Sequence, residues 1–202
     1  MRPISICAVV FTAVSTFAVP VQWRVEDGGN GHWYERVGDF FDLDSRKNWH
    51  DAKAISEGRT HEGASGHLLT VASEAEHQFI LDTFLRDHPW PLWIGLTDLE
   101  QYGGHESSFP DDSGWVWVTG EPVTFSRWGP GSPDQTQVDE DAALYGSSIE
   151  EYGRLYQWND AQPQDHAAFL VEYEPVAVPD STPFAMTIAC TALVGMRRFW
   201  KR

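Results

Sequence analysis

The chain has 202 residues, a length that corresponds to about one domain. Its 14 Lys and Arg residues against 30 Asp and Glu residues give a formal net charge of −16, which argues against a nucleic-acid binder, because such proteins neutralise phosphates with clustered basic side chains. The hydrophobic fraction of 42% excludes a disordered chain, so we expect a folded domain whose partners are neutral ligands, cations or basic surfaces.

The first 18 residues are typical of an export signal. Arg2 precedes a mostly apolar run over residues 4–17, and the small residues Thr16 and Ala18 fit a cleavage site. The run is shorter than the roughly 20 residues that a membrane-spanning helix needs. An uncleaved membrane anchor is the alternative, and both interpretations predict an exported protein.

The domain itself, predicted over residues 19–176, begins with strands and helices in alternation. Alternating polar and aromatic residues predict a half-buried strand at 31–37. Asn48 is a plausible N-cap for a helix over 48–55 whose apolar face carries Trp49.

A second strand and a second helix follow. Residues 66–71 predict a short strand, and Ser73 with Glu76 three residues later forms a capping box. Apolar residues at helical spacing continue from there, so we expect the second helix to run from about Glu74 to Asp87.

The second half of the domain loses this helical periodicity. Short apolar segments alternate with Gly, Pro, Asp and Ser, which predicts strands divided by long loops; these segments cover 92–96, 115–118, 155–158 and 168–173. Their tryptophans are expected in the core and are Trp93, Trp115, Trp117 and Trp158. One loop, from about Thr124 to Ser148, is longer than compact domains usually leave without structure, which makes it a functional candidate.

Oxygen-bearing side chains gather in this loop and shortly after it. Asp134, Glu140, Asn159 and Asp160 offer the hard oxygen ligands that Ca²⁺ prefers, of which it binds about six to eight. Pro133 lies beside the first of them, and X-Pro bonds adopt the cis form at low cost. A cis bond here would turn the neighbouring carbonyl groups toward one point.

Several separated motifs resemble the C-type lectin-like domain, and they agree with it in order and spacing over residues 30–174. They are Trp-Ile-Gly-Leu-Thr-Asp at 93–98, Gly-Trp-Val-Trp at 114–117, Trp-Gly-Pro-Gly-Ser-Pro-Asp at 128–134 and Trp-Asn-Asp at 158–160. The resemblance implies an α+β fold in which two helices flank antiparallel sheets and a long loop carries the calcium and ligand site. It also implies a cis Pro133 and a binding domain that is not an enzyme.

Carried over residue by residue, the resemblance assigns the principal calcium site. It implies metal ligands at Ser132, Asp134, Glu140, Asn159 and Asp160, the last four of which would also bind the sugar. Ser132 departs from the Glu or Gln that is usual in the family, and its shorter hydroxyl is a weaker ligand.

The same resemblance implies a possible second metal site at Asp98, Gln135 and Asp141. Trp128, beside the loop, is a candidate for stacking on a sugar face. A disulfide that is usual in the family has no counterpart, because Ala142 or Ala143 stands where the first cysteine is expected.

The last 26 residues are predicted to be a sorting signal. A Val-Pro-Asp-Ser core at 178–181, an apolar run at 184–196 and a basic end at 197–202 resemble the PEP-CTERM class of bacterial signals. This resemblance implies a partner protease of the exosortase type and transient anchoring in the inner membrane. A permanent tail anchor is the alternative. Both cysteines, Cys7 and Cys190, lie in the two terminal segments, so the mature domain would contain none.

These observations predict an exported, calcium-dependent carbohydrate-binding module at the cell surface or in an extracellular matrix. The alternative is a structural or protein-interaction domain that contacts matrix proteins without binding sugar. A glycoside hydrolase, the third hypothesis, would need a pair of carboxylates about 5–9.5 Å apart, and no spacing in the sequence singles out such a pair.

Overall fold

The computed structural model describes residues 19–87, 90–134, 139–146 and 156–176. The predicted export signal, the predicted sorting signal and Gln135 lie outside these residues. Among the described residues, no helix has the length and apolar character needed to cross a bilayer.

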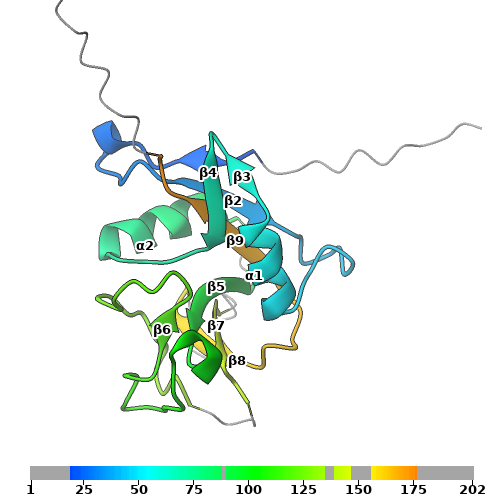
Figure 1. Cartoon of the computed structure of the whole chain (residues 1–202), viewed down its shortest axis with the longest axis vertical. Helices are drawn as coiled ribbons and strands as arrows, with labels where there is room; N and C mark the ends of the chain where they lie inside the picture. The colour runs from blue at the N-terminus through cyan, green and yellow to red at the C-terminus, as the bar shows by residue number, and fades with distance from the viewer. Residues whose placement is uncertain (1–18, 88–89, 135–138, 147–155, 177–202) are drawn as a thin grey trace, which may run out of the picture.

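Helices and strands alternate along the first half of the chain, and strands dominate the second half (Figure 1). The helices are α1 (Trp49–Glu57) and α2 (Glu74–Ile80), with the short turns η1 (Val25–Asp27), η2 (Leu81–Leu85) and η3 (Glu100–Tyr102). The strands are β1 (Val21–Gln22), β2 (Trp33–Val37), β3 (Thr60–His61), β4 (Ala64–Leu68), β5 (Leu92–Thr97), β6 (Val116–Trp117), β7 (Ala142–Tyr145), β8 (Trp158–Ala161) and β9 (Ala168–Tyr173).

The strands form one continuous network in the order β1-β2-β9-β5-β7-β8, with β4 also paired to β9 and β6 paired to β5. Most pairs are antiparallel, as expected. The pair of β5 and β9 is the exception. These two strands run parallel, with Leu92 opposite Ala168 and Trp93 opposite Phe169. The sheet is therefore mixed. All six residues of both strands are buried, as is typical of strands covered on both faces.

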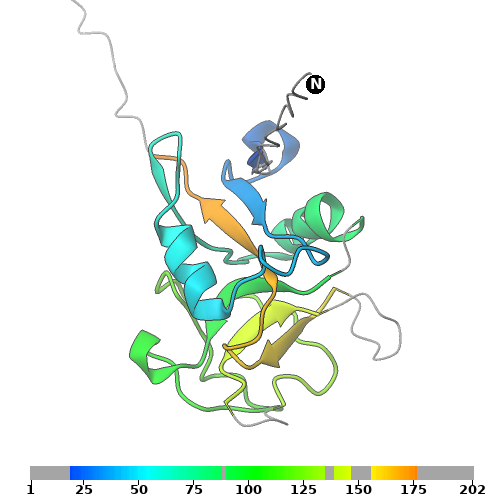
Figure 2. The same cartoon turned by 90° about the vertical axis from the view of Figure 1, so that its right-hand side faces the viewer.

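Helix α1 is capped as predicted. The Asn48 side chain accepts a hydrogen bond from the Asp51 backbone N–H at 2.9 Å. Trp49 is fully buried, and its indole Nε1 donates to the Ile94 carbonyl at 2.9 Å, which ties the first turn of the helix to β5. Figure 2 shows α1 and α2 on opposite sides of the strands.

Helix α2 begins at the predicted capping box, where Ser73 Oγ accepts from the Glu76 backbone N–H at 3.1 Å. The α-helix ends at Ile80, earlier than predicted, and the chain continues as one π-helical segment, η2. The apolar positions after Ile80 still face the core, since Phe84 and Leu85 are buried. Hydrophobic periodicity alone does not distinguish these two kinds of helix.

The strand predictions were wrong at the boundaries of β4 and β8, and they missed β7. Strand β8 covers Trp158–Ala161 rather than 155–158. Strand β4 covers Ala64–Leu68 rather than 66–71. Strand β7, Ala142–Tyr145, lies inside the segment that was predicted to be a loop, because two alanines next to an acidic turn give little strand signal. Pairing overrides this weak propensity, since β7 lies between β5 and β8 and is antiparallel to both.

The predicted core tryptophans are confirmed. Trp93 and Trp158 are 0% exposed, Trp117 is 2% exposed and Trp115 is 3% exposed. The rings of Trp117 and Trp158 pack edge to face with centroids 5.7 Å apart. Large aromatic rings thus fill the core of a domain whose described residues include no cysteine.

A polar cluster is buried near β2 and β9. His32 Nδ1 lies 2.6 Å from Glu172 Oε1, and Tyr34 Oη donates to Glu76 Oε1 at 2.7 Å. Thr70 donates to the other oxygen of Glu172 from its N–H at 2.9 Å and from its hydroxyl at 3.0 Å. Burial alone would lower the pKa of His32, but the hydrogen bond and charge of Glu172 outweigh it, so the His32 pKa is raised.

A His32→Gln substitution should therefore destabilise the fold in a pH-dependent way. A raised histidine pKa contributes stability that is present below about pH 6.5 and is lost as the pH rises through the folded-state value. We expect a loss of about 1.5–3 kcal/mol at acidic pH and a smaller loss in alkaline buffer. Urea unfolding of the parent protein and the variant, from acidic to alkaline pH, measures the difference in their free energies of unfolding. A difference that does not change with pH would contradict the prediction.

Candidate functional site

The predicted ligand loop lies along the edge strand β8, in the lower half of the molecule in Figure 1. The Trp158 N–H donates to the Arg127 carbonyl, and the Gly129 N–H donates to the Trp158 carbonyl, both at 2.8 Å. Trp128 and Trp158 form an isolated parallel bridge. The beginning of the loop is therefore fixed by backbone pairing to the strand that carries Asn159 and Asp160.

Two more contacts join the tip of this loop to β8. Ser132 Oγ donates to Asn159 Oδ1 at 2.8 Å, and the Asp134 N–H donates to Asp160 Oδ2 at 2.7 Å. The peptide bond between Ser132 and Pro133 is cis, as the resemblance implied. Two loop residues on either side of Pro133 thus contact two consecutive residues of β8.

Three of the predicted metal ligands form a carboxylate cluster, which we call the principal cluster. Asp134, Glu140 and Asp160 each offer an oxygen, and these oxygens lie within 4.8 Å of one another. Glu140 is 4% exposed and Asp160 is 1% exposed. Negative charges held this close and away from water repel one another, and a divalent cation bound among them would neutralise most of this repulsion. The structure therefore brings together residues that lie as many as 26 positions apart.

A second carboxylate cluster lies next to the first and consists of Asp98, Glu106 and Asp141. The Thr97 hydroxyl and the Asp98 N–H both donate to the Asp141 carbonyl, which holds β5 against the acidic turn. Burial, together with the charges of Asp141 and Glu106, raises the pKa of Asp98 to about 7.

Asp98 and Asp141 were predicted from the sequence, whereas Glu106 was missed. It lies in the long connection after β5, and only its acidic character in a segment rich in Gly and Ser could have drawn attention to it. Gln135, the remaining residue of the predicted second site, lies outside the described residues.

Trp128 is half-buried in an aromatic cluster. Its ring lies edge to face with Trp115, with centroids 4.7 Å apart, and with Trp158 at 6.0 Å. These core rings cover much of the Trp128 side chain. Trp128 therefore helps to hold the loop in place, and stacking on a sugar is its second, predicted role.

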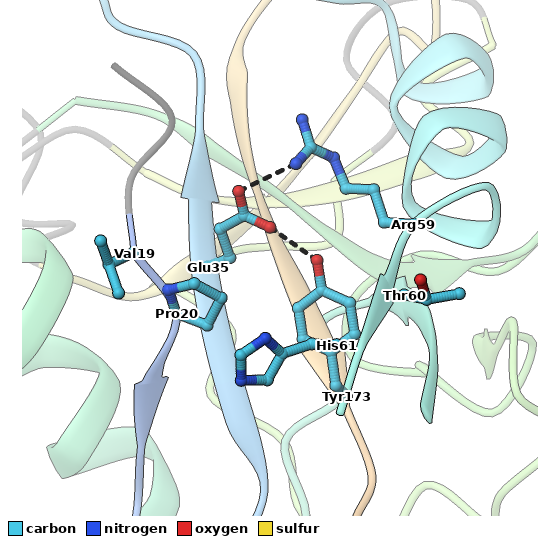
Figure 3. Close-up of a pocket in the computed structure, with 7 residues that line it drawn as sticks. All are labelled: Val19, Pro20, Glu35, Arg59, Thr60, His61 and Tyr173. Carbon is cyan, nitrogen blue, oxygen red and sulfur yellow. Dashed lines mark hydrogen bonds and ion pairs between the residues drawn. The ribbon is translucent and has the colours of Figure 1, made fainter. Parts of the chain in front are cut away.

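A separate pocket of about 340 Å³ lies among the strands that precede and follow the ligand loop (Figure 3). At its centre, Glu35 accepts from Arg59 Nη1 at 2.8 Å and from Tyr173 Oη at 2.6 Å. These contacts join β2 and β9 to the residue that precedes β3. None of the predicted site residues lines this pocket, whose residues are Val19, Pro20, Glu35, Arg59, Thr60, His61 and Tyr173.

The sequence matches the lectin C-type domain over residues 45–170. This match covers more than half of the chain, which therefore belongs to the C-type lectin domain family. The mixed sheet and the two helices are those of this fold, and membership agrees with the expectation that the chain is not an enzyme.

Individual relatives come from distant organisms. The chain is 30% identical over 170 residues to halomucin of Haloquadratum walsbyi, covering 78% of this chain and 2% of halomucin. It is 28% identical to an alpha-N-acetylgalactosamine-specific lectin of Patiria pectinifera, covering 65% of this chain and 67% of that lectin. The chain thus spans a small part of halomucin and about two thirds of the Patiria lectin.

Among solved structures, human lithostathine superimposes with a TM-score of 0.56 at 21% identity, covering 77% of this chain and 88% of lithostathine. At this level of identity the likeness is one of fold.

A Trp128→Ala substitution should destabilise the domain even without any ligand, because the ring packs on Trp115 and Trp158. We expect a loss of about 3 kcal/mol, the low end of the range for removing a buried tryptophan. Urea unfolding in the presence of a chelator measures this loss. A variant as stable as the parent protein would show that the ring does not hold the loop.

Proposed function

We propose that this protein is an exported, calcium-dependent carbohydrate-binding module. The observation that carries the proposal is the principal cluster, in which carboxylates from the loop, from the acidic turn and from β8 converge within 4.8 Å. Family membership alone would not support this function, because one fold hosts many functions.

The donor set of the principal cluster suits a calcium ion. Asp134, Glu140 and Asp160 supply carboxylate oxygens, and Asn159 adds an amide oxygen beside them. Ser132 takes part indirectly, since its hydroxyl donates to the Asn159 amide oxygen and orients it. Calcium tolerates such mixed oxygen ligands in flexible geometry, and bound calcium would neutralise most of the repulsion between the carboxylates.

The sugar would bind at the same ion. In the family that the chain belongs to, loop ligands share the metal with two neighbouring hydroxyl groups of a sugar, and we assign this role to Asp134, Glu140, Asn159 and Asp160. The name of the Patiria relative, a lectin specific for alpha-N-acetylgalactosamine, supports a carbohydrate ligand and suggests a first sugar to test.

A second ion would bind at Asp98, Glu106 and Asp141. Asp98 is 3% exposed, and burial with the charges of Asp141 and Glu106 raises its pKa, so a cation beside these carboxylates would favour the charged form of Asp98. Gln135 remains a proposed ligand of this ion. Because Glu140 and Asp141 are adjacent, the two ions would be neighbours.

The terminal segments support the exported role. We infer that residues 1–18 direct export, that residues 19–176 form the binding domain and that residues 177–202 sort the protein to the cell surface or matrix. An exosortase-type protease and transient membrane anchoring follow from the pattern of the last segment. Extracellular calcium is abundant, which suits a site of low affinity.

An Asp160→Asn substitution should abolish stabilisation by calcium. Saturating the parent protein at about 100 times the dissociation constant stabilises it by about 2.7 kcal/mol, which corresponds to a rise in melting temperature of about 5–10 °C. The variant keeps the size of the side chain but loses a charge, so we expect little or no rise. Thermal melts with calcium and with a chelator measure both values.

Asp165→Asn is the matched control, since Asp165 is an exposed aspartate shortly after β8. It should retain the full calcium response. Calcium-dependent binding to immobilised N-acetylgalactosamine should disappear with Asp160→Asn and persist with Asp165→Asn. If the parent protein responds to calcium but binds no glycan, the matrix-protein alternative gains support; without a calcium response, the proposed metal site is wrong.

A Glu106→Gln substitution should remove the second ion and leave the first. Calorimetric titration of the parent protein is expected to show about two calcium ions per chain, and that of the variant about one, because Glu106 touches only the second cluster. Sugar binding should weaken less than with Asp160→Asn. An unchanged stoichiometry would exclude Glu106 as a ligand.

A further inference from the structure

The connection between η3 and β6, residues 103–115, is folded against the ligand loop. It closes on itself through bonds from the His105 N–H to the Gly114 carbonyl at 3.1 Å and from the Gly114 N–H to Ser107 Oγ at 3.2 Å. A Cβ atom at Gly114 would overlap the His105 carbonyl oxygen, so only glycine allows this closure.

The tip of this connection is joined to the candidate site by its backbone. The Phe109 N–H donates to the Pro133 carbonyl at 2.6 Å, and Pro133 is the residue before Asp134 of the principal cluster. A turn in which the Asp111 N–H donates to the Ser108 carbonyl at 2.9 Å holds the tip in shape. The Phe109 backbone is therefore bonded to the direct neighbour of Asp134, which is a proposed ligand of both calcium and sugar.

The Phe109 side chain is 62% exposed, although it is a large apolar ring. Among the described residues, none of the aromatic ring contacts involves Phe109. Phe41, the other strongly exposed phenylalanine, differs in this respect, because its ring packs edge to face with Phe40 and Trp90. Leaving such a ring in water forgoes the free energy of burying its apolar surface, which a bound ligand can recover.

We propose that Phe109 determines ligand specificity by packing its ring against the apolar C–H face of the sugar held at the principal cluster. This inference rests on the proposed function, since the ion would fix the hydroxyl groups while the ring covers the carbon skeleton. Ligand sites commonly combine a few convergent polar groups with apolar walls in this way. Trp128, whose ring already packs on core tryptophans, is the less suitable platform.

The charges around Phe109 restrict the class of sugar. Glu106, Asp111 and Asp112 belong to the same connection, and all three are exposed. Each proposed calcium ion carries two charges against three carboxylates in its cluster, so these clusters, together with Asp111 and Asp112, keep a negative field that repels sulfated sugars and uronic acids. The structure thus favours a neutral saccharide at this site.

The test compares Phe109→Ala with Phe41→Ala, a matched change at an exposed ring on a different connection. Full-length proteins are titrated with N-acetylgalactosamine, galactose and mannose conjugates in calcium, with heparin as the sulfated probe. We expect Phe109→Ala to weaken binding of the neutral conjugates about tenfold, while Phe41→Ala changes nothing and heparin does not bind. Phe109→Trp should retain binding because it keeps an aromatic face.

The rise in melting temperature with calcium separates this inference from the function on which it rests. Phe109→Ala should keep the full rise, because the side chain is not a metal ligand. Unchanged sugar binding in Phe109→Ala, or preferential binding of heparin, overturns the inference while the calcium-dependent function stands. A parent protein that binds none of the conjugates overturns both.

Discussion

The backbone pairing of Arg127–Gly129 with Trp158 is the contact on which the candidate site depends. Trp158 is fully buried among Trp117, Trp128 and other rings, so β8 cannot shift without opening the core. The next residues of that strand, Asn159 and Asp160, receive the hydrogen bonds of Ser132 and Asp134. Aromatic packing thereby sets the position of side chains whose mutual repulsion would otherwise separate them.

Three consecutive acidic residues of the chain form the turn before β7. Asp139 adopts a left-handed conformation with φ of 64°, and the following residues point to different clusters. Glu140 contributes to the principal cluster and Asp141 to its neighbour. One turn therefore couples the two clusters, and a cation at either one would change the electrostatic energy of the other.

Much of this arrangement could be predicted from the sequence, because helix caps and apolar segments are formed by residues close together in the chain. The caps at Asn48 and Ser73 identify both helices, and buried tryptophans identify the strands. The resemblance to the C-type lectin-like domain implied a shared site for Asp134, Glu140 and Asp160, with Asn159 beside them, and the three carboxylates do lie together.

Other features depend on tertiary contacts and leave no local signal. The parallel pairing of β5 with β9 joins segments far apart in the chain, and β7 forms from a weak strand sequence because two neighbours pair with it. Glu106 and Phe109 belong to a long connection whose path is set by its closure at Gly114 and its bond to Pro133, and Glu106 joins the second carboxylate cluster. The end of α2 was misjudged because a π-helix keeps the same apolar face inward.

The position of the domain's two ends has a mechanical consequence. Val21 pairs with Tyr34, and Tyr173 pairs with Trp33, so the described chain enters and leaves through neighbouring strands of one region of the sheet. A pulling force between the ends would be carried by β1, β2 and β9, and none of the proposed ligand residues lies on these strands. Tension between the two ends would load this part of the sheet first and spare the loop that carries the proposed ligand residues.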